Sequence, residues 1–420
     1  MYKQSFSEKN LIEVRTQRQY KSKVFKQKND LPTLADTSAS ISEGSYISAE
    51  FDNYFINKKP VYCTASKADE VVFSKLNHNI RGLYRVKQSD RHSIVKQVMS
   101  LLKEESPKYV YKFDIKDFYK NVDVNSCLTK IQNDQVVSAE SEIVFKEFVR
   151  QLKNTSIEGL PRGIGLSATL SELAMRDFDQ KMMSHKNVYY YSRYVDDILI
   201  FALEKIDIKS DLISFLPKGL ELNWGKTKVL EVKKCLCQRK CLCASTLKVC
   251  KCFAKCKCKL NTDSKQLLFD FLGYSFSFPS LAKSKSSDWI KIDLSISKAK
   301  KLKRRLYLSF KSYIDKGNSN LLENRIKFLT GNHYIPQYKN KTDRMKSGVY
   351  YNYIHINEPL QYKELDSFLS TLIRRDYGKR IFLSPQHKKA LIKYSFLSGF
   401  KSKRLCTLNG VQINKIKGCW

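Results

Sequence analysis

Residues 189–201 read YYYSRYVDDILIF. Aromatic and β-branched residues on both sides of the acidic pair favour two strands joined by a tight turn. The stretch therefore predicts a hairpin with Asp196 and Asp197 at its tip. An adjacent acidic pair in a turn is usually solvated, so the pair alone identifies no chemistry.

A second aromatic run, at residues 109–119, reads YVYKFDIKDFY. It predicts a strand that brings Asp114 to its end. Buried like charges are costly without a cation, and Mg²⁺ prefers carboxylate oxygens and substrate phosphates. If Asp114 lies beside Asp196 and Asp197, the three acids suit two Mg²⁺ or Mn²⁺ ions about 4 Å apart. Such a pair activates a 3′-hydroxyl and stabilises a leaving pyrophosphate.

The composition narrows the class of protein. The chain has 420 residues, 42% apolar and 28% charged, which excludes a disordered or collagen-like protein. Its 76 Lys and Arg exceed 41 Asp and Glu, leaving a net charge of +35. That charge favours nucleic acid as a partner over a merely soluble basic protein.

The longest apolar run, 198–203, is too short to span a membrane. Residues 1–10 lack the apolar core of a secretory signal, so we expect a cytoplasmic protein with no membrane partner.

Five motifs in order make the chain similar to reverse transcriptases. In chain order they are FDIKDFY (113–119), LPRGIGLSATLSE (160–172), YVDD (194–197), GLELNWGKTK (219–228) and FLGY (271–274). The resemblance implies an α+β, right-hand polymerase fold with fingers, a palm built on an antiparallel sheet and a helical thumb. It implies RNA-directed DNA synthesis, with an RNA template, dNTPs and a DNA product.

The resemblance also implies roles for single residues. Asp114 and Asp196 would bind both catalytic ions, and Asp197 would complete the carboxylate set. Ile115 would lend its backbone carbonyl to a metal ion. Tyr119 stands where the family has an aromatic steric gate that excludes a ribose 2′-hydroxyl; the alternative is a core aromatic.

Other candidate contacts with the nucleotide lie in three segments. Gly163 belongs to a loop whose backbone can approach a nucleotide closely. Arg162 stands where the family usually has glutamine, and it can pair with phosphate or stack on a template base. Lys226 is a candidate to protonate or neutralise pyrophosphate, or is a solvated lysine. Lys87 and Arg91 resemble the fingers residues that grip the triphosphate; the alternative is an exposed basic helix start.

The pattern along the chain predicts three regions. Residues 1–45 are expected to form a basic helix and a polar linker, with the linker at 36–44. Residues 46–290 are expected to form the fingers and palm, and residues 291–420 the thumb and a helical C-terminal region. In the thumb, apolar residues recur every three or four positions from Ile296 until Gly317 ends the helix. The candidates to grip a nucleic-acid backbone, unless they form a solvated face, are Lys298, Lys301, Arg304 and Arg305.

Eight of the twelve cysteines lie in an insertion at residues 233–260. They are Cys235, Cys237, Cys241, Cys243, Cys250, Cys252, Cys256 and Cys258. In a reducing cytosol, eight thiolates can close two four-cysteine Zn²⁺ sites, with the pairing of ligands left open. Nine basic residues and no acid accompany them between residues 233 and 259, which suits contact with RNA or DNA. The alternative is a disulfide-stapled or disordered loop.

Three stretches resemble bacterial antiviral, defence-associated reverse transcriptases. Residues 324–333 and 348–353 are similar to the C-terminal part of those enzymes. Residues 4–10 are similar to the smaller enzyme of the class that pairs two reverse transcriptases with a noncoding RNA. This resemblance implies a structured noncoding RNA, a second reverse transcriptase subunit and phage-restricting DNA synthesis.

Two other interpretations stay open. One is a non-templated or protein-primed terminal nucleotidyltransferase on the same palm. The other is a non-enzymatic nucleic-acid-binding scaffold organised by the cysteine cluster. An intact set of three acids argues against the scaffold, because gathered carboxylates without a cation only repel one another.

Overall fold

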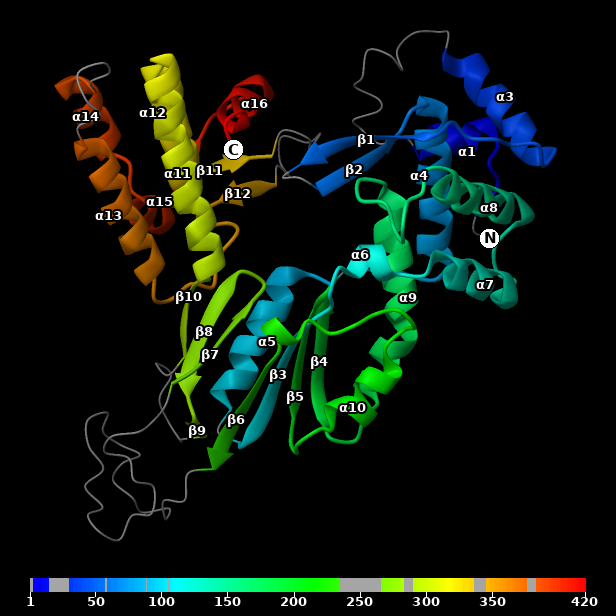
Figure 1. Cartoon of the computed structure of the whole chain (residues 1–420), viewed down its shortest axis with the longest axis horizontal. Helices are drawn as coiled ribbons and strands as arrows, with labels where there is room; N and C mark the ends of the chain where they lie inside the picture. The colour runs from blue at the N-terminus through cyan, green and yellow to red at the C-terminus, as the bar shows by residue number, and fades with distance from the viewer. Residues whose placement is uncertain are drawn as a thin grey trace. The chain divides into compact units, whose positions relative to one another are not determined.

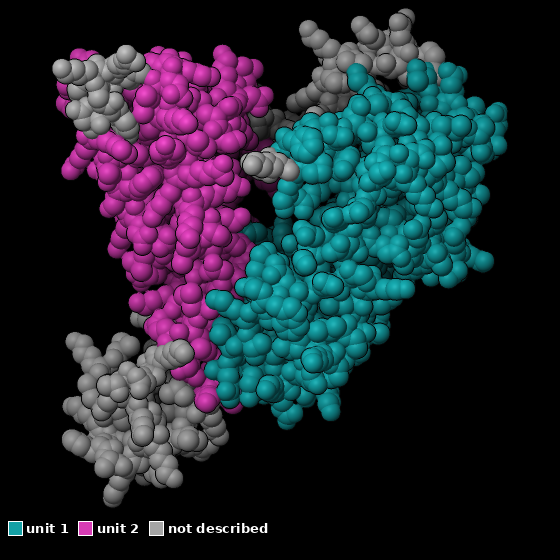
Figure 2. Space-filling view, viewed as in Figure 1, with its two compact units in different colours: residues 1–91, 108–231 teal, residues 92–107, 232–420 magenta. Residues whose placement is uncertain are grey.

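The structure is a computed structural model. It describes residues 3–14, 30–56, 59–87, 89–104, 106–234, 266–282, 290–335, 345–375 and 383–420. The chain forms two compact units, one of residues 1–91 and 108–231 and the other of residues 92–107 and 232–420 (Figure 2). The predicted boundaries of fingers and palm (46–290) and thumb (291–420) stay predictions.

The first unit begins with α1 (Glu8–Glu13) and α3 (Asp30–Ser42) (Figure 1). The expected linker at 36–44 is wrong, because α3 continues through most of it. Leu34 and Ile41 stand two helical turns apart and are both buried, so tertiary packing overrides the Ser- and Thr-rich composition. The expected N-terminal helix is found only as α1, and residues 15–29 lie outside the described residues.

A hairpin and a set of helices follow. The antiparallel strands β1 (Phe51–Ile56) and β2 (Lys59–Thr64) lead into α4 (Lys67–Leu83). Ser66 caps α4 by accepting a hydrogen bond from the Asp69 backbone N–H. Helix α4 packs against α8 (Ala139–Asn154) and α9 (Gly165–Met183), with α7 (Val124–Asp134) beside both of the latter.

The largest sheet has the strand order β4-β5-β3-β6-β9. Its strands are β3 (Lys108–Asp114), β4 (Val188–Tyr194), β5 (Asp197–Ala202), β6 (Lys228–Lys234) and β9 (Leu281–Ala282). Strand β5 is antiparallel to both β3 and β4. Strand β3 is buried along almost its whole length, and four of its seven residues, at positions 109–111 and 113, are apolar or aromatic. Mixed helices and antiparallel strands agree with the predicted α+β class.

The second unit contains α5 (Arg91–Lys103), of which residues 92–103 belong to it, and a sheet of order β10-β8-β7. The strands β7 (Gln266–Phe271), β8 (Tyr274–Pro279) and β10 (Lys291–Leu294) are antiparallel. Leu272 and Gly273 both have positive φ, at 50° and 79°, and form the two-residue turn of the FLGY motif.

Helices dominate the rest of the second unit. They are α11 (Ile296–Lys316), α12 (Ser319–Thr330), α13 (Leu360–Arg374), α14 (Pro385–Ile392), α15 (Phe396–Lys401) and α16 (Gly410–Lys417). The predicted helix beginning at Ile296 is confirmed, and Gly317 ends it with φ 68°.

A small sheet ties these helices together. It has the order β12-β11-β13, with β11 (Asn332–Tyr334), β12 (Lys346–Gly348) and β13 (Leu405–Cys406). The fully buried Asn332 amide donates to the carbonyls of Gly399 at 3.3 Å and Arg404 at 3.1 Å. Its side-chain oxygen accepts from the Tyr350 N–H at 2.9 Å. One asparagine thus joins three segments that are distant in sequence.

The structure does not test two of the predictions, the zinc sites and the cytoplasmic location. The eight clustered cysteines lie between residues 235 and 258, outside the described residues, so the predicted zinc sites stay a prediction. The cytoplasmic location is likewise untested. Within the described ranges, no helix combines the length and the apolar character needed to cross a membrane.

Candidate active site

Backbone pairing brings the three predicted acids together. Strand β3 ends at Asp114, whose Cα partner is Asp197, the first residue of β5. Asp196 occupies the turn before β5, and its carbonyl accepts a 3.0 Å hydrogen bond from the Ile115 N–H. The predicted hairpin is confirmed, and all three carboxylates lie at one edge of the sheet.

The GLELNWGKTK segment (219–228) contacts Asp114 through both its backbone and a side chain. The Asn223 N–H donates to the Asp114 carbonyl at 2.7 Å, and the short helix Trp224–Lys226 follows. Lys226 Nζ lies 3.0 and 2.9 Å from the two Asp114 carboxylate oxygens. This hydrogen bond, more than any other contact, raises the pKa of Lys226. Lys226 is therefore a protonated cation at neutral pH, held against the first acid.

A second lysine, which sequence reasoning missed, accompanies Asp197. The Lys112 side chain is buried, and its Nζ lies 3.1 Å from Asp197 Oδ1. Lys112 and Asp114 are two residues apart on β3 and therefore point to the same face. That spacing is the signal that would have identified Lys112.

The environment of Asp196 disfavours its charged form. Burial raises its pKa, and the neighbouring charges of Asp197 and Asp114 raise it further. A cation between these acids relieves that repulsion. Among the described residues, no cluster of three or more His, Cys, Asp or Glu is positioned to enclose a metal by itself. Asp114 and Asp196 still fit Mg²⁺, which usually completes its ligand shell with water and substrate phosphates.

A cavity of about 740 Å³ adjoins the acids. Its wall includes Asp114, Ile115 and Asp196, together with the predicted nucleotide contacts Tyr119, Arg162, Gly163 and Lys226. Lys87 is exposed and Arg91 begins α5, and neither contributes to the described wall. Lys59, the exposed first residue of β2, lines the cavity instead. The sequence offered no signal for it, because Lys59 is one of many lysines in the chain.

Tyr119 forms part of the floor of this cavity. It belongs to α6 (Phe118–Asn121) and is half-buried. Burial raises the pKa of its hydroxyl, and Ser171 on α9 hydrogen-bonds to that hydroxyl. The Tyr119 carbonyl accepts a 2.7 Å bond from the Leu160 N–H, which joins α6 to the loop before α9. The ring is therefore held at the cavity wall, and its role as a steric gate stays a prediction.

The packing of the protein around residue 163 leaves room for glycine alone. Gly163 has a φ of 106°, and a Cβ at this position would lie 2.4 Å from the Tyr62 carbonyl oxygen and 2.7 Å from Val61 Cγ1. The Tyr62 N–H donates to the Arg162 carbonyl at 2.6 Å. Strand β2 therefore packs directly against the loop, and the predicted close approach of a nucleotide to Gly163 stays a prediction.

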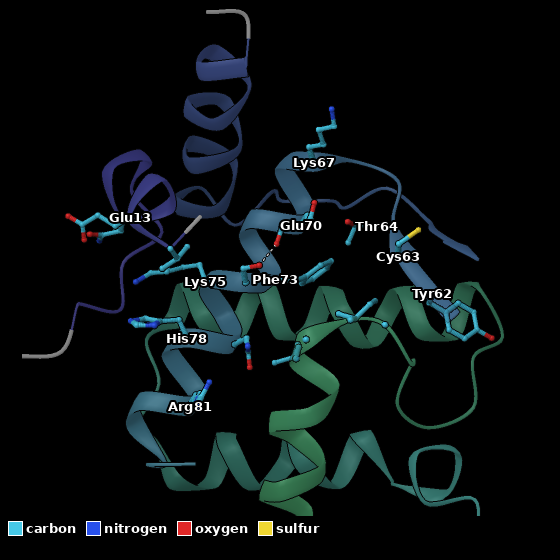
Figure 3. A pocket seen from close by; sticks show the side chains of 18 of the residues that line it. Glu13, Tyr62, Cys63, Thr64, Lys67, Glu70, Phe73, Lys75, His78 and Arg81 are labelled. Atoms are coloured by element: carbon cyan, nitrogen blue, oxygen red, sulfur yellow. Dashed lines mark hydrogen bonds between the residues drawn. The ribbon is translucent and has the colours of Figure 1, made fainter. Parts of the chain in front are cut away.

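A larger groove of about 1130 Å³ runs along α4. Figure 3 shows Lys75, His78 and Arg81 following one another along this helix, with Lys67 near its start. Basic side chains outnumber the acids Glu13 and Glu70 in the groove wall. Residues 163–165 line both this groove and the cavity beside the acids. The two hollows therefore share one wall.

In the second unit, α11 carries the four predicted backbone-gripping residues. Lys298, Lys301 and Arg304 are exposed. Arg305 is half-buried, with its guanidinium 5.0 Å from the centre of the Trp420 ring, and burial lowers its pKa. The first turn of α11 has no acid and contains Lys298. Basic residues at a helix N-terminus oppose the helix dipole, so a bound anion would stabilise this end.

Three comparisons relate the chain to known proteins. The family model "Reverse transcriptase (RNA-dependent DNA polymerase)" matches residues 63–276, just over half of the chain. One similar solved structure is that of telomerase from Candida albicans in complex with the TWJ fragment of telomeric RNA. The two are 12% identical, with a TM-score of 0.31, and the match covers 83% of this chain and 53% of the telomerase chain. The chain thus spans about half the length of that protein. A search of curated proteins gives no match.

Proposed function

Because the chain belongs to the reverse transcriptase family, we propose that it synthesises DNA on an RNA template at the edge formed by Asp114, Asp196 and Asp197. The observation that carries this proposal is the backbone pairing of Asp114 with Asp197 and of Ile115 with Asp196. The pairing fixes the three acids beside a cavity large enough for a nucleotide.

In this proposal each side chain has a separate task. Bound Mg²⁺, which the family generally uses, supplies the positive charge that activates the primer 3′-hydroxyl and stabilises the leaving pyrophosphate. Asp114 and Asp196 would hold the ions, with Asp197 and the Ile115 carbonyl completing the ligand set. Lys226 carries a proton within reach of the site and neutralises or protonates the pyrophosphate.

Substrate selection is assigned to the cavity wall. The Tyr119 ring lies under the deoxyribose and excludes a 2′-hydroxyl. Arg162 and Lys59 extend charged side chains that can pair with the triphosphate or the template backbone. Gly163 keeps the loop pressed against β2, so that the wall does not close on the nucleotide.

The groove along α4 is assigned to the unpaired RNA template. It is basic, it adjoins the nucleotide cavity through residues 163–165, and Tyr54 and Tyr62 line it with aromatic rings. Aromatic faces stack on bases and lysines pair with phosphates, which together hold single strands with little sequence preference. In the second unit, Lys298, Lys301 and Arg304 are proposed to hold the product duplex.

The direct test is primer extension on an RNA template with dNTPs and Mg²⁺. The double substitution Asp196→Ala with Asp197→Ala should abolish extension, whereas Asp177→Asn, an exposed acid on α9, should retain it. Activity that survives the double substitution would refute the assigned centre. The product sequence separates templated synthesis, which copies the RNA, from free terminal addition, which does not.

We further propose a role in bacterial antiviral defence with a structured noncoding RNA and a second reverse transcriptase. The support is the resemblance of residues 4–10, 324–333 and 348–353 to those enzymes. The first stretch is an ordered part of the fold, because Gln4 accepts from Asn79 and Ser138 and donates to the Val136 carbonyl. Sequencing the RNA that co-purifies, and probing for a second polymerase chain, tests this role. Heterogeneous cellular RNA with no partner would contradict it.

The cysteine insertion is proposed to hold two Zn²⁺ ions in four-cysteine sites. The support is the spacing of the eight cysteines in the sequence. Elemental analysis should find about two zinc ions per chain. A metal-free protein whose eight cysteines all react with a thiol reagent would refute the proposal.

A further inference from the structure

The turn that carries Asp196 has an unusual backbone. Val195 has a φ of 60°, in the left-handed region. Residues other than glycine, asparagine and aspartate rarely adopt this conformation, and a β-branched residue does so only when its surroundings hold it there. The turn before the acid therefore depends on contacts that fix it.

Arg193 supplies one such contact. It lies on β4, its side chain is 4% exposed, and its Nη1 donates to the Val195 carbonyl at 3.0 Å. Its position is fixed in turn by two acids of α9. Nε and Nη2 lie 2.8 and 2.7 Å from the two Asp179 oxygens. Nη1 and Nη2 lie 3.2 and 2.6 Å from the two Glu172 oxygens.

This geometry needs a guanidinium. Two carboxylates each receive a pair of parallel hydrogen bonds, and one N–H remains for the turn. A planar fork with five donors can make this set, whereas a lysine ammonium has three donors and no fixed plane. Asp179 and Glu172 orient the Arg193 guanidinium, and the guanidinium holds the Val195 carbonyl, which immediately precedes Asp196.

We propose that Arg193 is a positioning residue for the polymerase centre. By holding the Val195 carbonyl it keeps the turn in its left-handed conformation and sets the direction of the Asp196 carboxylate. This inference rests on the proposed function, because it concerns the same acid. Asp196 would still be joined to β3 through its own carbonyl and Ile115 without Arg193, so the strand pairing would survive while the side chain moved.

A purely structural role would be to tie β4 to α9, and the chain contains a matched control for that role. The Tyr191 hydroxyl, also on β4, donates to the same Asp179 carboxylate at 2.5 Å. Tyr191→Phe removes one bond between β4 and α9 and leaves the bonds of Arg193 to the turn and to Glu172 in place. The pair Arg193→Lys and Tyr191→Phe therefore separates positioning from tethering.

The test measures Tm, the kcat and KM of primer extension, and Mn²⁺ binding to the protein by electron paramagnetic resonance. Arg193→Lys should lower kcat about 100-fold with the KM for dNTP within about 3-fold, because a small displacement of a reacting group is that costly. It should weaken Mn²⁺ binding about 10-fold, as loss of a group that orients a metal ligand does. Tyr191→Phe should lower Tm but leave kcat and Mn²⁺ binding within about 2-fold of the parent.

Two further variants keep the proposal falsifiable. Glycine adopts positive φ without strain, so Val195→Gly added to Arg193→Lys should recover about 10-fold in kcat. If Arg193→Lys does not fold, Glu172→Gln, which weakens one side of the fork, should show the same pattern at smaller size. Equal kcat losses in Arg193→Lys and Tyr191→Phe, or losses that match the unfolded fraction, would overturn the proposal. Mn²⁺ binding needs no polymerase activity, so an inactive parent protein would refute the proposed function and still leave the positioning role measurable.

Discussion

The sheet edge with the three acids and the groove along α4 are built in different ways. At the edge, main-chain pairing places Asp114 and Asp197, and Lys226 and Lys112 lie within 3.1 Å of them. The groove is lined by the N-terminal segment, the β1–β2 hairpin, α4, loop residues 163–164 and the first residues of α9. The edge is thus fixed by backbone pairing, whereas the groove is formed by side chains of several separate segments. We expect the edge to control the rate of the chemical step and the groove to control affinity for RNA.

The sharpest test of this contrast is Asp114→Asn. The change removes a charge at the edge but keeps the shape of the side chain, so kcat should fall about 1,000-fold or more. RNA affinity, measured by filter binding, should stay within about 2-fold, because the groove does not contain Asp114. An equal loss of affinity and kcat would mean that the two regions are not separable.

Tyr119→Ala tests the floor of the cavity. Removal of the ring should raise the efficiency of ribonucleotide incorporation relative to deoxyribonucleotide by about 100-fold, since the steric block to the 2′-hydroxyl is lost. The readout is the ratio of kcat/KM for the two nucleotides. Tyr119→Phe keeps the ring and should keep the selectivity. An unchanged ratio in Tyr119→Ala would assign the ring to the core alone.

Gly163→Ala should damage both the cavity beside the acids and the groove along α4, because residue 163 lies in the wall that they share. The added Cβ would lie 2.4 Å from the Tyr62 carbonyl oxygen at a φ that favours glycine, so the free energy of unfolding should fall by about 2 kcal/mol. Gly165→Ala is the matched control, since its Cβ would find no atom closer than 3.8 Å. Unfolding in denaturant measures the free energy of unfolding of both variants. Equal stability of the two variants would contradict the packing of β2 against the loop.

The smallest effect is expected in the groove. Lys67→Ala with Arg81→Ala should weaken RNA binding about 10-fold and reduce the slope of log Kd against log salt by about 1.4, as two lost phosphate contacts on a single strand would. The kcat at saturating RNA should not change. Lys146→Ala with Lys153→Ala removes two lysines of α8 outside the groove wall and should alter neither quantity. A groove variant that binds RNA normally would leave the template path unassigned.

The central acids could be predicted because local signals agreed. Aromatic strands surround Asp114 and the Asp196–Asp197 pair, and their order along the chain matches the family motifs. The contacts that surround these acids could not be predicted from the sequence. Whether Arg193 reaches Val195, or Lys59 rather than Lys87 lines the cavity, depends on strand register and on side-chain directions that no short pattern encodes.

Two other differences have physical explanations. Residues 36–42 have the polar composition of a linker, yet they form helix because Leu34 and Ile41 are buried on one face. The approach of a nucleotide to Gly163 stays a prediction, and the structure adds a second requirement, since a strand distant in sequence excludes any side chain there. Tertiary contacts decided both cases.

The hydrogen bond from the Tyr62 N–H to the Arg162 carbonyl, with Gly163 packed against the same strand, couples the β1–β2 hairpin to the loop before α9. A force applied to β2 is transmitted to the wall of the nucleotide cavity without any change in the acids. A substitution that displaces β2 should therefore change the shape of this cavity wall while the strand pairing that places the three acids is kept.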